Sequence, residues 1–174
     1  KVIFKRLEIY NWLPYKGHKK IDFSSGRKKI TIIRGNNKGG KSAILRAIKW
    51  VLYGNTGDYS IYKENLSLLN REAKKEGERS FHVDLIVDIE GDEIVFHRAK
   101  KGRKGITTLQ EKDFEEDDFV ITKKGKSIPN PEKFVKEIMD EAISRFFLFD
   151  GEMLQEYKQL VTGSKEALVL KEHI

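Results

Sequence analysis

The alternation of apolar and polar residues at the start of the chain predicts a β-hairpin. Over residues 2–10 apolar side chains alternate with charged ones, with one slip in the period. Pro14 and Gly17 then indicate a turn, and residues 18–23 can return as a second strand. We expect the first strand of this hairpin to be an edge strand or a mixed one.

The next pattern predicts a strand, a glycine-rich loop and a helix in succession. Residues 28–33 end in four β-branched residues, which is typical of a buried strand, and we expect this strand to be central. Over residues 42–53 apolar side chains recur every three or four positions, with Arg46 and Lys49 on the opposite side. Gly54 follows as a suitable helix end.

The remaining elements are expected to be short. Residues 55–78 are polar and are interpreted as a loop with one short helix, whereas residues 81–89 and 93–98 alternate on either side of a turn sequence and predict a second hairpin. The other expectations are a short strand at 119–122, a helix at 132–143 that begins at Pro131, and helices at 153–160 and 164–174.

Composition limits the class of protein. The 174 residues are enough for one domain with a core, no apolar run reaches the roughly 20 residues of a membrane span, and there is no cysteine. Without disulfides or a secretory signal, a cytoplasmic location is the expectation. The chain begins with lysine and ends in a helical pattern, which favours a fragment of a longer protein.

Charge favours a polyanionic partner. The net charge is +7, and nucleic acid is the leading candidate. Two groups of basic residues, both expected to be exposed, can contact DNA phosphates or can simply be solvated. They are Lys16, Lys19, Lys20, Arg27, Lys28 and Lys29 near the first hairpin, and Arg98, Lys100, Lys101, Arg103 and Lys104 near the second. An acidic block, also expected to be exposed, follows at 111–118.

The strongest motif lies between the predicted strand and the predicted helix. The segment from Gly35 to Ser42 fits GxxxxGK[ST], the phosphate-binding loop of nucleotide hydrolases. Its glycines let main-chain N–H groups point at phosphate oxygens, and the helix N-terminus adds partial positive charge. Lys41 is then expected to reach the β- and γ-phosphates of ATP, and Ser42 to bind Mg²⁺. The alternative is an ordinary glycine-rich turn before a helix.

The nucleotide-binding candidates are the whole loop and the residue after it. Asn37 can also cap or position the loop. The candidates are Gly35, Asn36, Asn37, Lys38, Gly39, Gly40, Lys41, Ser42 and Ala43.

Four segments together resemble the N-terminal half of an SMC-like ABC ATPase head. They are LEIYNWLPYKGHKKIDF, ITIIRGNNKGGKS, AILRAIKWVLYG and FFLFDGE. The likeness is greatest to SbcC-type repair ATPases and, through RFFLFDGE, to DndD-type ATPases of DNA phosphorothioation and phage defence. The resemblance implies an α/β P-loop NTPase lobe with an antiparallel β-subdomain.

The same resemblance implies a divided enzyme. Residues 1–162 would form the N-terminal lobe and residues 163–174 a helix leading toward a coiled-coil arm. A C-terminal lobe would supply the signature motif and the Walker B carboxylates, since neither is found in this sequence. Two such heads would enclose two ATP molecules, bind double-stranded DNA through its backbone and act with a nuclease or another effector.

Two positions depart from the family's pattern. Asp150 stands where the family usually has the glutamine of the Q-loop, and Lys38 stands where it usually has glycine. The resemblance therefore implies Lys41 and Asp150 as catalytic residues and Ser42 and Asp150 as ligands of Mg²⁺. Two alternatives stay open: residues 146–150 can be a Walker B strand of a compact, complete NTPase, or the loop is degenerate and the chain only binds DNA.

Other candidates favour structural roles. Trp12 and Tyr15 can contact adenine or belong to the core, and the core is the expectation. Arg71 stands alone in a polar segment, which is typical of a surface residue. The four histidines, His18, His82, His97 and His173, lack the spacing of metal ligands and are expected to be structural or exposed.

Overall fold

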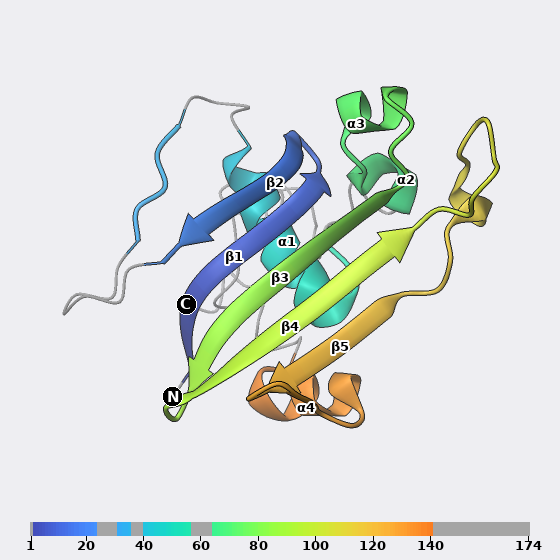
Figure 1. Cartoon of the computed structure of the whole chain (residues 1–174). Helices are drawn as coiled ribbons and strands as arrows, with labels where there is room; N and C mark the ends of the chain where they lie inside the picture. Colours follow the sequence, from blue (N-terminus) through green and yellow to red (C-terminus); the bar gives the residue numbers. More distant parts are fainter. Residues whose placement is uncertain (1, 24–30, 36–39, 57–63, 141–174) are drawn as a thin grey trace, which may run out of the picture.

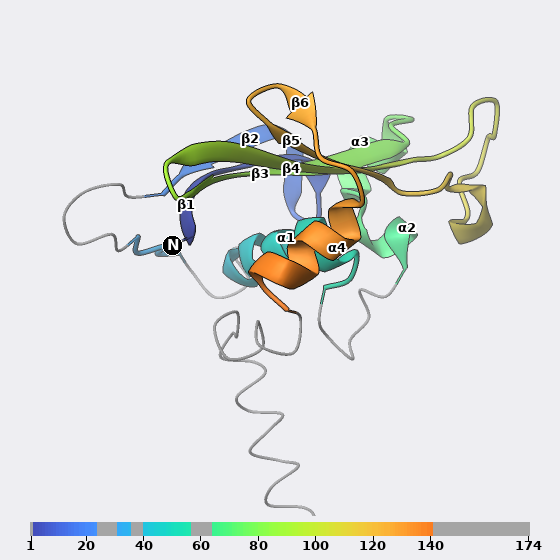
Figure 2. The same ribbon diagram turned by 90° about the horizontal axis from the view of Figure 1, so that it is seen from below.

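The computed structural model describes residues 2–23, 31–35, 40–56 and 64–140. In this part of the chain a six-stranded antiparallel sheet forms one layer, and two helices form a second layer on one of its faces (Figures 1 and 2). None of the helices among these residues is long and apolar enough to cross a bilayer. The predicted coiled-coil start and residues 141–174 lie outside the described residues.

The strands pair in the order β2-β1-β3-β4-β5-β6, and every neighbouring pair is antiparallel. Both predicted hairpins are confirmed, as is the short strand near residue 120. The strands are β1 (Val2–Trp12), β2 (Tyr15–Asp22), β3 (Ser80–Ile89), β4 (Asp92–Lys101), β5 (Asp118–Lys123) and β6 (Lys126–Ser127).

The position of β1 in the sheet differs from the predicted one, and its register explains the slip in the apolar pattern. β1 lies between β2 and β3, so it is an interior strand, and β2 is the edge. The slip in its apolar period corresponds to a register shift against β3 between Phe4 and Arg6, where one extra residue is accommodated.

Alternation along the strands places the core between the sheet and α1 (Lys41–Tyr53). Leu7 and Ile9 of β1 and four apolar residues of β3 are buried on this face. Three aromatic rings form the centre of the core, with Trp12, Trp50 and Phe81 separated by 5.2–5.8 Å between ring centroids. Burial of such large side chains is the main source of stability here.

The predicted helix after the glycine-rich loop is confirmed, including its end at Gly54. Gly54 has φ 74°, and its N–H donates to the carbonyl of Trp50. One detail differs from expectation: Lys49 is buried, at 6% exposure, although it was assigned to the solvent side. Because other elements cover α1 on more than one side, its buried surface extends beyond the apolar stripe and includes Lys49.

Of the other described helices, α4 is shorter than predicted, and some of the short ones were not predicted. α4 (Pro131–Ile138) begins at the predicted proline but ends before Met139, whose backbone is extended (φ −153°), so the predicted end at residue 143 is wrong. The described residues of the polar segment 55–78 include two short helices, α2 (Asn65–Leu68) and α3 (Arg71–Lys75), where one was expected. A single turn of 3-10 helix spans Glu111–Asp113.

The expected central strand before the glycine-rich loop is not formed in its described part. Thr31, Ile32, Ile33, Arg34 and Gly35 belong to no strand, and the side chains of Ile32 and Ile33 are 71% and 41% exposed. A strand needs a neighbour to bond its backbone. None of the six strands in the described part of the chain is that neighbour.

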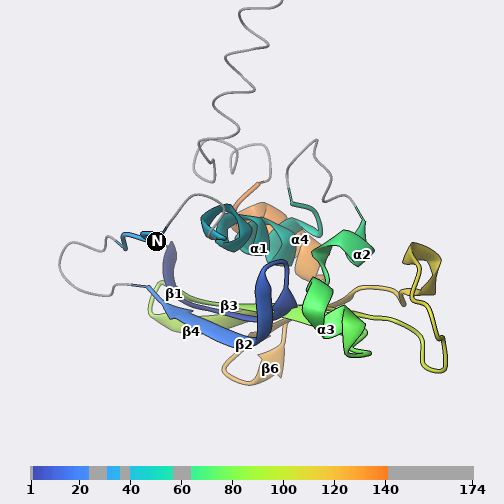
Figure 3. The same cartoon turned by 90° about the horizontal axis from the view of Figure 1, so that it is seen from above.

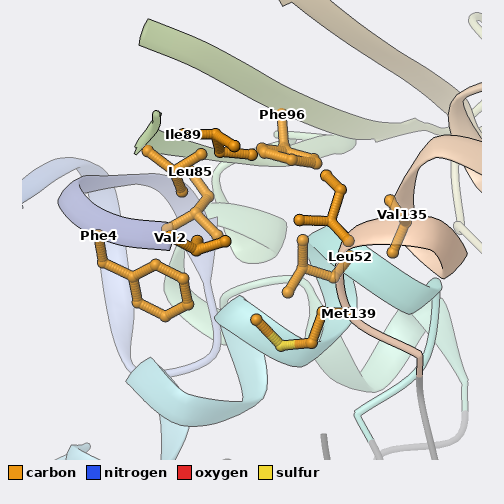
Figure 4. A pocket seen from close by; sticks show the side chains of 10 residues that line it. Val2, Phe4, Leu52, Leu85, Ile89, Phe96, Val135 and Met139 are labelled. Carbon is orange, nitrogen blue, oxygen red and sulfur yellow. The ribbon is translucent and has the colours of Figure 1, made fainter. Parts of the chain in front are cut away.

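α4 closes the open end of the core against α1 and the sheet (Figures 2 and 3). A small pocket remains between them, and its lining is entirely apolar (Figure 4). Leu52 of α1, Phe96 of β4 and Val135 of α4 face it from three elements. The described residues around this pocket offer no polar side chain that could orient a substrate, and the pocket is part of the packing.

Candidate phosphate-binding site

The described part of the predicted phosphate loop is its two ends. Gly35 is one end, and Gly40 begins the other, immediately before α1; residues 36–39 lie outside the described residues. Gly40 occupies the N-cap of α1 with φ 90°, a conformation that glycine adopts without the steric cost borne by other residues. The local sequence therefore produces the sharp entry into a helix that a phosphate loop needs.

The start of α1 is suited to an anion. No side chain caps it, and no acidic residue lies in its first turn. The aligned peptide dipoles give a helix N-terminus a partial positive charge, which here is not offset by the helix's own side chains. A phosphate would meet attraction there without repulsion from a carboxylate in the first turn of α1.

The Lys41 side chain lies across the mouth of the loop. Its Nζ donates to the carbonyl oxygen of Gly35 at 2.7 Å, so the amine links the two ends of the segment. This places a cation beside the helix N-terminus, as the motif predicts. The position of the amine also fits an anion, because a phosphate oxygen can replace the neutral carbonyl as a stronger, charge-assisted acceptor.

Of the two residues predicted to bind Mg²⁺, the structure describes only one. Ser42 is half-buried in the first turn of α1, but Asp150 lies outside the described residues. Among the described segments no group of three or more histidine, aspartate or glutamate side chains is suited to a metal ion. The Mg²⁺ site and the two alternative interpretations of Asp150 therefore stay predictions.

Two residues at the turn between β1 and β2 form hydrogen bonds with the start of α1. The sequence pattern did not indicate this contact. Trp12 is fully buried, as expected for a core residue, and its Nε1 donates to the carbonyl of Ala43 at 2.9 Å. The hydroxyl of Tyr15 donates to the carbonyl of Gly40 at 3.1 Å. The only signal for this contact in the sequence was the presence of two aromatic residues in one turn.

Part of the predicted DNA-binding surface is not exposed. Arg98 is buried on the helix-covered face of the sheet, where it donates to the carbonyl of Val51 at 3.2 Å and to Asp117 at 2.7 Å. Its guanidinium also lies 3.8 Å from the ring centroid of Phe119. Lys100 binds Asp117 at 2.8 Å with a side chain that is 12% exposed. The strand period directs both residues inward, and Arg98 connects the sheet to the C-terminal end of α1 through Val51.

The charges of Arg98 and Asp117 shift each other's pKa in opposite directions. Burial lowers the pKa of Arg98, and the Asp117 carboxylate opposes that change. Burial also disfavours the charged form of Asp117, but hydrogen bonds from Lys100 and Arg98 outweigh it and lower the pKa of Asp117. The acidic block is exposed from Glu115 to Asp118, as predicted, whereas Asp113 is buried. Asp117, although exposed, also acts as the counterion of two inward-facing cations.

Apart from Arg98 and Lys100, the predicted basic residues in the described part of the chain are exposed, and Arg27, Lys28 and Lys29 lie outside the described residues. Lys101, Arg103 and Lys104 are exposed beside the end of β4. On β2, Lys16 forms an ion pair with Glu76, and Lys20 pairs with Asp22 at 3.4 Å. Exposed ion pairs of this kind are weak, but they reduce the net positive charge of the first hairpin.

Three of the histidines lie together on the sheet face opposite α1. The rings of His18 and His82 lie 4.5 Å and 5.1 Å from the ring of Tyr10, and His97 Nδ1 lies 2.6 Å from Asp84. The hydrogen bond to Asp84 raises the pKa of His97, whereas burial lowers the pKa of His82. This cluster is a surface feature of the sheet, consistent with the structural or exposed role predicted from spacing.

Comparison with known proteins places these features in context. Residues 6–172 match the family described as AAA domain. The chain is 27% identical over 154 residues to the DNA double-strand break repair Rad50 ATPase of Thermoplasma volcanium. The aligned region covers 87% of this chain and 16% of that protein. The chain thus spans about one sixth of the length of this curated relative.

A solved structure is also similar. The SMC head domain from Thermotoga maritima aligns with 24% sequence identity and a TM-score of 0.43. The alignment covers 79% of this chain and 41% of that one.

Proposed function

The chain belongs to the AAA domain family, and on this premise we propose that it is the ATP-binding N-terminal lobe of an SMC-like and Rad50-like ATPase head. The observation that carries the proposal is the geometry at the start of α1. The GxxxxGKS segment places a left-handed glycine, Gly40, at the N-cap of α1, and the Lys41 amine bonds the carbonyl of Gly35 at the start of the segment. The similarity to a Rad50 ATPase supports the same assignment.

The chain's own residues have distinct tasks in this proposal. Main-chain N–H groups between Gly35 and Ala43 would hold the triphosphate, and Lys41 would exchange its bond to the Gly35 carbonyl for phosphate oxygens. Ser42 and Asp150 are the groups proposed to hold Mg²⁺. When bound, the metal would neutralise charge that develops on the phosphates.

The proposed active site is completed by other parts of the protein. The sequence has no signature motif and no apolar run that ends in Asp-Glu, and the chain spans 16% of its curated relative. The exposed Ile32 and Ile33, immediately before the loop, are consistent with a second lobe that covers them. We therefore propose that hydrolysis requires a C-terminal lobe and a second head, each supplying groups that the other lacks.

Calorimetric titration with nucleotides tests ATP binding. We expect the chain to bind ATP in the presence of Mg²⁺, to bind ADP more weakly, and to bind AMP at least tenfold more weakly than ATP, because Lys41 and the loop recognise the outer phosphates. Turnover by the chain alone should be slow. Equal affinity for ATP and AMP would contradict the phosphate-loop assignment, and rapid turnover would favour the compact, complete NTPase.

We further propose that the protein binds double-stranded DNA through its backbone. The net charge of +7 and the exposed Lys101, Arg103 and Lys104 support this, as does the name of the Rad50 relative. Reversing these three charges to glutamate should weaken duplex binding and flatten its dependence on salt, measured by fluorescence anisotropy at several salt concentrations. The matched control reverses Lys123, Lys124 and Lys126 at the β5–β6 turn. If both triple variants lose the same affinity, the surface beside β4 is not a specific contact.

A further inference from the structure

The turn between β1 and β2 contacts the phosphate-binding segment at two points. Trp12 bonds the Ala43 carbonyl inside the first turn of α1, and Tyr15 bonds the Gly40 carbonyl at the N-cap. In Figure 3 this hairpin turn rises from the sheet toward the start of α1. The two aromatic residues thus connect the sheet to the residues that begin the helix.

The backbone of this turn is strained. Asn11 has φ 49° and Leu13 has φ 47°, so two residues with side chains occupy the left-handed region within three positions. Such conformations cost free energy and persist when the surrounding structure fixes them, and they are concentrated at functional sites. A strained turn in contact with a proposed nucleotide site therefore suggests a role at that site.

Hydrogen bonds to the end of α2 and to Asn70 hold the strained residues. The N–H of Leu13 donates to the carbonyl of Leu68 at 2.8 Å, and its carbonyl accepts from the Asn70 side chain at 2.6 Å. The carbonyl of Asn11 accepts from the N–H of Asn70 at 2.8 Å, and its side chain accepts from the N–H of Gly17 at 2.9 Å. The turn is consequently a rigid support with few ways to relax.

The support fits closely against Gly40. A Cβ atom at Gly40 would lie 2.8 Å from the Tyr15 hydroxyl oxygen and 3.0 Å from Cγ of Pro14. The Gly40 carbonyl accepts both from Tyr15 and from the N–H of Ala43, at 3.0 Å. A tyrosine hydroxyl is protonated at neutral pH, and burial raises the pKa of Tyr15 further, so the hydroxyl is available as a donor. Tyr15 therefore fixes the orientation of the peptide unit that joins the loop to the helix.

We propose that Tyr15 is a positioning residue for triphosphate binding, which holds the Gly40 peptide so that the main-chain N–H groups at the start of α1 can meet the phosphates. This inference rests on the proposed ATP binding and deepens it. It differs from an adenine contact, because the Tyr15 hydroxyl is directed at the loop's own backbone. Its effect reaches the nucleotide through Gly40 and is independent of the base.

Replacement of Tyr15 by phenylalanine tests the inference, since it removes only the hydroxyl. We expect affinity for ATP and for inorganic tripolyphosphate to fall by the same factor, about threefold to tenfold, as for the loss of one hydrogen bond. Titration calorimetry of the full chain provides both affinities. The matched control is Tyr53→Phe, because the Tyr53 hydroxyl donates to the Met139 carbonyl at 3.0 Å at the other end of α1. This control should bind both ligands as the wild type does.

The outcomes separate this inference from the proposed function. If the wild type binds neither ligand, ATP binding itself is wrong and the inference falls with it. If the wild type binds and Tyr15→Phe is unchanged for both ligands, the positioning role alone is overturned. A loss for ATP without a loss for tripolyphosphate would overturn it in favour of a contact to the nucleoside. An equal loss in Tyr53→Phe would assign the effect to general stability, which thermal denaturation of both variants measures.

Discussion

Replacement of Lys41 by alanine is expected to weaken ATP binding about a hundredfold or more while leaving the fold intact. The amine lies at the loop mouth on the Gly35 carbonyl, so it needs little movement to reach a phosphate. Hydrogen bonds to a charged partner contribute about 1.5–3 kcal/mol each, and two such bonds exceed a hundredfold in affinity. Calorimetry with ATP and Mg²⁺ measures the loss.

The control for Lys41 removes the same charge elsewhere. Lys20→Ala, on the edge strand β2, breaks only an exposed ion pair with Asp22 and should retain wild-type ATP affinity. Thermal denaturation should give similar midpoints for both variants. If Lys41→Ala binds ATP as the wild type does, the ATPase-head assignment is eliminated. If Lys20→Ala loses as much ATP affinity as Lys41→Ala, the loss is explained by the change in net charge.

Replacement of Asp117 by alanine is expected to lower the free energy of unfolding by about 2–3 kcal/mol, a value below that for a fully buried pair. The Arg98 side chain is 6% exposed, and it would lose its counterion while staying enclosed by Trp50 and Phe119. Asp117 itself is 33% exposed, so solvent offsets part of the loss. Urea denaturation followed by tryptophan fluorescence measures the change, because Trp50 lies in the affected core.

The sign of the pH dependence follows from the lowered pKa of Asp117. A group whose pKa is lower in the folded state stabilises the protein above its unfolded pKa, and the contribution is lost as pH falls through the folded value. The difference between wild type and variant should therefore be full at neutral pH and shrink in acid. Glu116→Ala, at an exposed neighbouring carboxylate, is the matched control and should change stability by less than about 0.5 kcal/mol. A similar small effect at Asp117 would show that Arg98 is adequately solvated.

In the described part of the chain, local patterns correctly predicted both hairpins, α1 and the strand near residue 120. Both hairpins follow from alternation and turn residues, because strand period and turn chemistry depend on neighbours in sequence. The same is true of α1, whose end at Gly54 requires only a residue that tolerates φ 74°. The phosphate loop was recognisable for this reason too: its glycines, Lys41 and Ser42 form one continuous segment.

Pairing between distant segments could not be predicted from such patterns. The β-branched residues before the loop indicate a strand, but Ile32 and Ile33 lie outside the six-stranded sheet, since strand formation depends on a neighbour that local sequence does not specify. The contact between Tyr15 and Gly40 joins residues 25 positions apart. It exists only because the β1–β2 turn is brought against the start of α1.

The sequence by itself predicted the phosphate-binding chemistry of the loop and determined the hairpins and the helix that follows, because each is encoded within a short stretch of chain. Only the tertiary structure decided which charges are available. Arg98 and Lys100 look like part of a basic surface in sequence, but the pleat of β4 turns both inward, where Asp117 neutralises them. Burial depends on which elements pack over a residue, and that depends on the whole fold.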